Sequence, residues 1–205
     1  LVCEDGSMFG EEYTLVACAD YVLGKLGGGN TVSNLSSSRA LRDVTEKHGG
    51  TYTASAVGEV NVVIKMKETN TVIGGEGNGG IILPASHYGR DSLVGVALFL
   101  SHMATTKISC KALRESYPSY FMSKNKIQLT PQIDVDKILE IMATKYANEE
   151  VNTIDGVKID FESQWVHLRK SNTEPIIRIY TESNSQLNAD ELAERFITEI
   201  KEIIA

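Results

Sequence analysis

Two short polar segments of this 205-residue chain carry side chains of the kind that recognise sugars and phosphates. Residues 74–80, with the sequence GGEGNGG, follow a β-like stretch and contain one carboxylate, Glu76, and one carboxamide, Asn78. Glycines permit positive φ angles and a close approach of the backbone to a ligand. A carboxylate and a carboxamide two residues apart can accept from and donate to neighbouring hydroxyls, the pattern that a sugar ring presents. On its own the segment is also consistent with a plain glycine-rich turn.

The second segment covers residues 169–175, with the sequence RKSNTEP, and another arginine follows at position 178. Guanidinium groups match phosphate oxygens bidentately, and small hydroxyls with the backbone N–H groups of a turn can complete the shell. The alternative is a solvated polar turn between two strands. The residues expected to hold a phosphate are Arg169, Ser171, Asn172, Thr173 and Arg178.

The first half of the chain alternates between helical and strand-like patterns, which predicts an α/β layer with a mostly parallel sheet. The glycine run at 74–80 lies between a strand and the last of these helices, and Asp91 or Ser92 can cap that helix. Ser37 or Ser38 can cap an earlier one. Helices are expected at residues 11–26, 38–48, 60–68 and 91–103, and strands at 31–35, 51–54 and 71–73.

In the second half the order changes to clustered strands flanked by two helices, which is typical of a small α+β domain. Strands are expected at residues 127–129, 153–154, 157–161, 165–168 and 176–182, and helices at 134–146 and 189–203. We therefore predict a first domain over residues 1–110, a linker over 111–126 and a second domain over 127–205.

The composition limits the function classes. The 20 basic and 27 acidic residues give a net charge of −7, which argues against wholesale binding of nucleic-acid phosphates. No apolar run approaches the ~20 residues that cross a bilayer, and no signal peptide is apparent. Three cysteines without a CxxC pair indicate a reducing, cytoplasmic location. The four scattered histidines do not predict a metal site.

Taken together, the two polar segments resemble loops of the α-D-phosphohexomutases, the superfamily of phosphoglucomutase, phosphomannomutase and phosphoglucosamine mutase. Residues 75–80 resemble the sugar-recognition loop of the third domain, and residues 169–175 the phosphate-binding loop of the fourth. Segments 57–62, 89–91 and 117–118 resemble further parts of the family in the same order. The resemblance implies a three-layer α/β domain followed by a small α+β domain similar to the TATA-box-binding protein.

The sugar loop departs from the commonest bacterial pattern, which has Ser where Asn78 stands and often His at Gly80. Asn78 with Gly80 is more similar to the archaeal-type branch of the phosphoglucosamine and phosphomannose mutases. At the phosphate loop the family often has Gly where Asn172 stands. Glucosamine and mannose phosphates are therefore favoured as substrates, with glucose phosphate as a further candidate.

The resemblance implies an enzyme that moves a phosphate between the 6- and 1-positions of a hexose through a hexose 1,6-bisphosphate. The family's phosphoserine loop and its Asp-rich Mg²⁺ loop belong to the first and second domains, which this chain is expected to lack. Residues 53–56 imitate the start of the serine loop, but Ser55 lacks the His-Asn-Pro that follows it in the family. The chain is thus expected to recognise a sugar phosphate without catalysis.

In this interpretation Glu76 and Asn78 hold sugar hydroxyls, and the missing N-terminal domains of the same protein are partners. Arg39 adds positive charge near the sugar or lies on the surface. The alternative is a stand-alone, non-catalytic module that binds sugar phosphates. An open reading frame that extends upstream into the serine and metal loops would decide for the enzyme.

Overall fold

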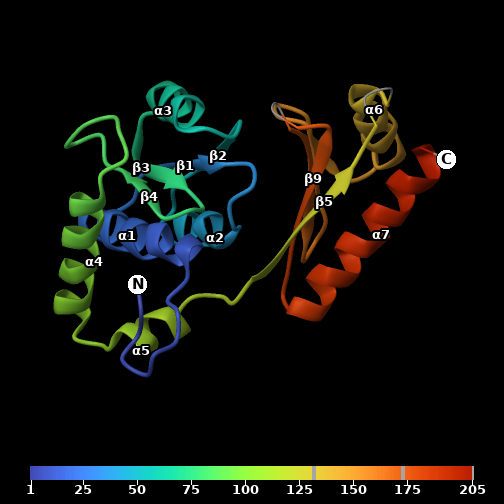
Figure 1. The fold of residues 1–205 in the computed structure, drawn as a ribbon. Coiled ribbons are helices and arrows are strands. Elements are labelled where there is room, and N and C mark those ends of the chain that lie inside the picture. The colour runs from blue at the N-terminus through green and yellow to red at the C-terminus, as the bar shows by residue number, and fades with distance from the viewer. Residues whose placement is uncertain (131–132, 172–173, 205) are drawn as a thin grey trace. The chain divides into compact units, whose positions relative to one another are not determined.

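The computed structural model describes residues 1–130, 133–171 and 174–204, and the predicted phosphate residues Asn172 and Thr173 therefore lie outside the described residues. The chain divides into two compact units, Leu1–Ser119 (unit 1) and Tyr120–Ala205 (unit 2). Figure 1 labels the elements of both units.

Unit 1 is a three-layer α/β structure. Its sheet has the strand order β2-β1-β3-β4, in which β1 is parallel to β2 and β3, and β4 is antiparallel to β3. Helix α3 covers one face of this sheet and helices α1 and α2 the other (Figure 1). The elements are α1 (Glu11–Leu26), β1 (Asn30–Asn34), α2 (Ala40–Lys47), β2 (Tyr52–Ser55), α3 (Glu59–Glu68), β3 (Thr71–Glu76), β4 (Gly80–Ile82), α4 (Ser92–Thr106) and α5 (Cys110–Glu115).

The parallel strands of unit 1 end together. Asn34 pairs with Ser55, the last residue of β2, and Ser33 pairs with Gly75 near the end of β3. Asn34, Ser55 and Glu76, the last residues of the three strands, therefore lie at one edge of the sheet. In open α/β sheets this carboxyl edge is where ligands bind.

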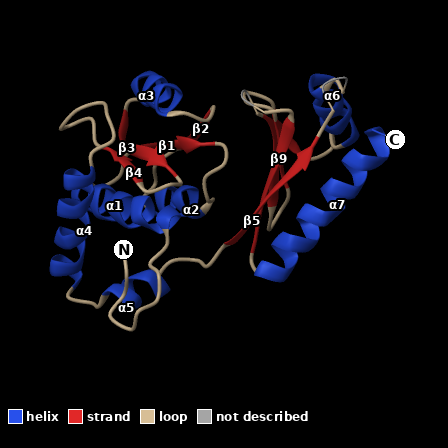
Figure 2. Ribbon diagram, in the orientation of Figure 1, coloured by secondary structure: helices blue, strands red, loops and turns tan. Residues whose placement is uncertain are grey.

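Unit 2 is an antiparallel sheet with the strand order β5-β9-β8-β7-β6. Helices α6 and α7 lie on the same side of this sheet (Figure 2) and bury one cluster of aliphatic and aromatic side chains against it. We call the other side the helix-free face. The elements are β5 (Phe121–Gln128), α6 (Val135–Lys145), β6 (Glu150–Asn152), β7 (Val157–Asp160), β8 (Trp165–Lys170), β9 (Ile176–Ser183) and α7 (Gln186–Ile204).

Both predicted fold classes are confirmed, but the expected linker over residues 111–126 is wrong for most of its length. Helix α5 ends at Glu115, and β5 begins at Phe121 rather than at Ile127. The early part of β5 contains Lys124, Asn125 and Lys126, polar residues that hide the alternation by which a strand is recognised in a sequence.

Two shorter elements also differ from the expectation. The strand expected at 153–154 lies at Glu150–Asn152, because the following residues form a turn in which Gly156 has a φ of 68°. Strand β4 was not expected, because it is only three residues long and begins at Gly80, the last residue of the glycine run.

Candidate functional site

The Glu76 carboxylate is held in place by two other segments of unit 1. Glu76 is only 6% exposed. Asn34 Nδ2, at the end of the neighbouring strand, donates to Glu76 Oε1 at 3.1 Å. Arg90 Nη1 lies 3.6 Å from the other oxygen, Oε2. A buried carboxylate needs such partners, because an uncompensated charge at this depth is costly.

The turn after Glu76 is fixed through its backbone. Gly77 N donates to Ser37 Oγ at 3.0 Å, and Gly80 N donates to Asn78 Oδ1 at 3.1 Å. A side chain on Gly75 would bring its Cβ to 1.9 Å from the carbonyl oxygen of Gly80. The tight β3–β4 hairpin therefore requires glycine at position 75.

The segment that follows β1 supports the same turn. Asn34 Oδ1 accepts from Ser36 N at 3.0 Å and from Ser37 Oγ at 3.2 Å. Glu12, in the first turn of α1, accepts from Ser38 N at 2.9 Å and packs against Gly77. The Asn34 side chain thus holds its own turn through Oδ1 and Glu76 through Nδ2.

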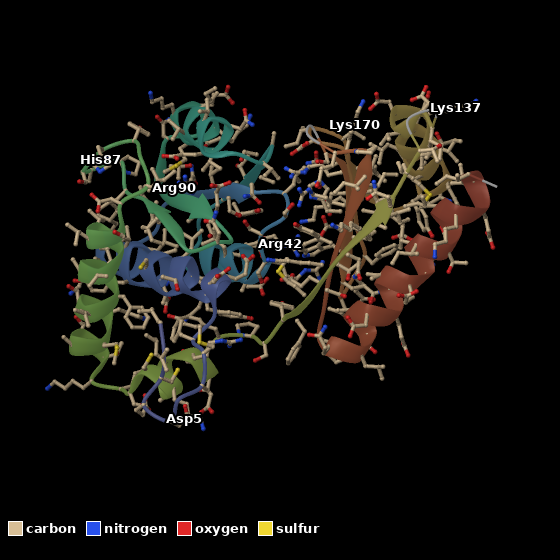
Figure 3. The ribbon with its side chains drawn as sticks, in the orientation of Figure 1. Asp5, Arg42, His87, Arg90, Lys137 and Lys170 are labelled. Atoms are coloured by element: carbon tan, nitrogen blue, oxygen red, sulfur yellow. The ribbon has the colours of Figure 1, made fainter. Side chains whose placement is uncertain are left out.

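Arg90 connects the loop to helix α3. Its backbone N donates to Glu59 Oε1 at 3.0 Å and its Nε donates to Glu59 Oε2 at 2.9 Å. Figure 3 shows Arg90 beside the sheet of unit 1. An open cavity of about 520 Å³ lies here, lined by Glu59, Asn78, Gly79, Gly80, Ile81, Arg90, Asp91 and Ser92.

The two predicted sugar ligands therefore differ in position. Asn78 lines this cavity, whereas Glu76 is covered and is not among the described residues around it. Ser55, which was excluded as a nucleophile, is buried and donates to the carbonyl of Ala56 at 2.9 Å. Arg39 is buried at the N-terminus of α2, so a surface position is wrong for it.

Three of the predicted phosphate residues are described: Arg169 lies in β8, Ser171 directly follows that strand, and Arg178 lies in β9. Ser171 is buried, and its backbone N donates to the carbonyl of Ile176 at 3.1 Å. Leu129 N donates to the carbonyl of Pro175 at 2.8 Å, which ties the turn to the end of β5. Lys170, shown in Figure 3, is directed toward α6, where its Nζ lies 2.8 Å from Asp136 Oδ2.

Arg169 and Arg178 stand directly opposite each other in the β8–β9 pairing, so their side chains share the helix-free face. Arg169 Nη1 lies 3.5 Å from Asp155 Oδ2. Arg178 Nε is buried, and no hydrogen bond reaches it within the part of the chain that the structure describes. Two cations in direct opposition repel each other, so this pair favours an anion between them.

Two domain models of one protein family match this chain, one in each unit. Residues 10–120 match the model "Phosphoglucomutase/phosphomannomutase, alpha/beta/alpha domain III", and residues 125–199 match the C-terminal domain model of the same family. The chain belongs to the phosphoglucomutase/phosphomannomutase family. Domain III precedes the C-terminal domain, as the sequence predicted.

Curated members of the phosphoglucomutase/phosphomannomutase family are similar over nearly the whole chain. A phosphoglucomutase/phosphomannomutase of Thermococcus kodakarensis is 33% identical over 98% of this chain, which spans 44% of that protein. A phosphoglucosamine/phosphogalactosamine mutase of Sulfurisphaera tokodaii is 33% identical over 84% of this chain and 38% of its own length. The chain thus spans less than half the length of these relatives.

Solved structures agree on the fold. The crystal structure of a phosphoglucomutase/phosphomannomutase family protein from Burkholderia thailandensis matches 98% of this chain with a TM-score of 0.80 at 23% identity. That match covers 43% of the other chain.

The Mg²⁺ that this family implies does not fit the described residues. No group of three or more His, Cys, Asp and Glu side chains among residues 1–130, 133–171 and 174–204 could hold a metal ion. Helices long and apolar enough to cross a membrane are likewise absent from the described residues. We therefore assign no metal-dependent step to this chain.

Two residues that support the 74–80 turn, Asn34 and Glu12, are not among the site residues predicted from the sequence. Both are structural: Asn34 is 6% exposed and Glu12 contacts the loop. The signal that finds Asn34 is its place at the carboxyl end of a parallel strand, next to the strand that ends in Glu76.

Proposed function

We propose that this chain supplies the sugar and phosphate recognition of a hexose-phosphate mutase, an enzyme that interconverts hexose 6-phosphate and hexose 1-phosphate. The observation that carries the proposal is the direct opposition of Arg169 and Arg178 beside the buried Ser171. Together with Asn172 and Thr173, which follow Ser171 in the sequence, they would hold the phosphate that is not reacting. Charge-assisted, bidentate contacts of this kind orient a substrate as well as bind it.

In unit 1, Asn78 would contact sugar hydroxyls from the cavity that it lines. Glu76 would act at the edge of the same turn, where Asn34 and Arg90 keep its carboxylate in one place. Phosphoryl transfer through a phosphoserine, Mg²⁺ and a hexose 1,6-bisphosphate would rest on residues outside this chain. The names of the relatives favour glucosamine, mannose and glucose phosphates as the substrates to compare.

Calorimetric titration with glucosamine 6-phosphate tests the proposal. We expect binding that weakens at least tenfold in Arg169→Gln, because a lost hydrogen bond to a charged group costs about 1.5–3 kcal/mol. Lys201→Gln is the matched control, since it removes one exposed positive charge from α7, on the other side of the sheet. Equal affinities of the two variants would contradict the proposal.

Mannose 6-phosphate and glucose 6-phosphate, titrated in the same way, rank the hexoses. Asn78→Ala should weaken the binding of all three sugars and leave the binding of inorganic phosphate unchanged. An equal loss for inorganic phosphate would remove Asn78 from the sugar site.

A further inference from the structure

The helix-free face of unit 2 carries a row of three cations. Lys126 of β5 pairs with Arg178 of β9, and Arg178 pairs with Arg169 of β8. Residues in direct opposition on antiparallel strands have side chains on the same face, with Cβ atoms about 5 Å apart. The cationic row, as we call these three residues, therefore crosses three adjacent strands in an unbroken line.

The other lysines of this face have partners of their own. Lys158 Nζ lies 3.6 Å from Asp160 Oδ2 and 4.4 Å from the centroid of the Trp165 ring. Lys124 Nζ lies 5.7 Å from the centroid of the Tyr180 ring. Lys126 is exposed, and it makes no ion pair and no contact with an aromatic ring among the described residues.

Charge balance distinguishes the cationic row from the rest of the face. The neighbouring Lys158 is balanced by Asp160, and Lys124 lies over the Tyr180 ring. In the cationic row, three positive charges face one carboxylate, that of Asp155 beside Arg169. The excess of two positive charges equals the charge of a phosphate monoester above its second pKa of about 6.

We propose that Lys126 is a third phosphate-binding residue that sets the charge preference of the site, so that a phosphate monoester dianion is bound in preference to a monoanion. This role of Lys126 rests on the proposed function, to which it adds one binding residue and a preference for dianions. Without Lys126 the row would carry an excess of one positive charge, which suits a sulfate ester or a phosphodiester. The ammonium group is carried on a flexible stem by the edge strand β5, next to Arg178 of β9.

The test compares two ligands that differ in charge and little in shape, glucose 6-phosphate and glucose 6-sulfate, at pH 7.5. We expect the full chain to bind the phosphate at least tenfold more tightly than the sulfate. Lys126→Gln should weaken phosphate binding roughly tenfold and leave sulfate binding within about twofold, so that the preference disappears. Lys126→Arg should retain it, and Lys201→Gln should behave as the parent chain.

The outcomes separate this inference from the proposed function. If Arg169→Gln and Arg178→Gln weaken phosphate binding while Lys126→Gln behaves as Lys201→Gln, the phosphate site stands and the role of Lys126 is overturned. An equal loss of both ligands in Lys126→Gln overturns the charge preference. If no variant of the row changes the binding of glucose 6-phosphate, the proposed function fails with it. Unchanged Trp165 fluorescence shows that each variant is folded.

Discussion

The two recognition segments are built in opposite ways. In unit 1 the polar groups of the sugar loop have partners within the protein: Asn34 and Arg90 for Glu76, and Ser37 for the backbone of Gly77. In unit 2 the cationic row sets like charges side by side and leaves Arg178 Nε without a hydrogen bond in the described residues. The sugar loop is thus preorganised by its own contacts, whereas the repulsion among the cations of the row is reduced when an anion binds.

This difference has an energetic consequence. Changes around the sugar loop remove stabilising contacts, so they should lower stability and binding together. Changes in the cationic row remove repulsion, so they should raise stability while they weaken binding. Such opposition between stability and function is common where a site holds unbalanced groups in readiness for a ligand.

The largest effect is expected at the hairpin of the sugar loop. Gly75→Ala places a methyl group 1.9 Å from the backbone oxygen of Gly80, which cannot move without breaking the β3–β4 pairing. We expect a loss of about 3 kcal/mol in the free energy of unfolding, the upper end for overpacking. Urea titration followed by far-ultraviolet circular dichroism measures it.

Gly77→Ala is the matched control for that variant. Its methyl group would meet the carboxylate of Glu12, the far end of a flexible side chain that can turn away. The loss should therefore be clearly smaller than that of Gly75→Ala. If the two variants are equally destabilised, close packing of the hairpin is not what requires glycine at position 75.

A second large effect is expected in the pH dependence of the stability of unit 2. Burial, together with the nearby charges of Lys158 and Arg169, lowers the pKa of His167 from 6.5 to about 4, against the hydrogen bond that its Nε2 donates to the carbonyl of Asp155. The unfolded chain takes up a proton near pH 6.5 and the folded chain only near pH 4, so stability falls as pH drops between these values. The loss should reach about 3 kcal/mol.

Urea unfolding followed by Trp165 fluorescence measures this dependence, because Trp165 is the only tryptophan and lies in unit 2. His167→Gln should remove most of the slope between pH 6.5 and 4. An unchanged slope in that variant would assign the dependence to other groups.

The stability of unit 1 should depend on pH in a lower range, because the group that titrates is a carboxylate. Burial raises the pKa of Asp20, but hydrogen bonds with His102, His48 and Tyr117 and the charge of Lys47 outweigh burial and hold that pKa well below its ordinary value. Its contribution to stability is present above pH 3.8 and is lost as pH falls below it. Asp20→Asn should therefore leave the slope between pH 6.5 and 4 unchanged.

An intermediate effect is expected at Asn34. Asn34→Ala removes the donor to Glu76 and leaves a buried carboxylate with one partner fewer, which costs about 1–3 kcal/mol. The affinity for glucosamine 6-phosphate should fall with stability, because Glu76 is no longer held in place. Asn61→Ala, which removes an exposed amide hydrogen-bonded to the carbonyl of Val57, is the control and should cost less than half as much.

Much of the fold could be predicted from the sequence, because many of its signals are local. The errors fall where an element depends on pairing with a distant strand. Helix α1 was predicted at its observed bounds because the apolar period and the glycines at its end act locally. The predicted start of strand β5 lies too far along the chain, because one face of the strand is polar. That the segment is a strand becomes clear only from its pairing with β9. Lys126 was therefore hidden in an apparent linker.

The candidate site divides in the same way. Residues in a recognisable run, such as Glu76 and Arg169, could be named from the sequence. Asn34 and Lys126 could not, because only strand pairing brings them beside those residues. A single sequence specifies which side chains a segment offers, and the register of a sheet decides which of them meet.

The smallest effect gives the sharpest contrast between the two units. Lys126→Gln should stabilise unit 2 by roughly 0.2–1 kcal/mol without ligand, because like charges in direct opposition cost about that much. Salt distinguishes this cause from any other gain: screening weakens repulsion between exposed charges, so the difference should shrink from 0.01 M to 1 M salt, where the Debye length is only about 3 Å. Lys124→Gln loses its contact with the Tyr180 ring and should gain nothing. A Lys126→Gln variant that is less stable than its parent at low salt would mean that the cationic row is not repulsive, and the two recognition segments would then be built alike.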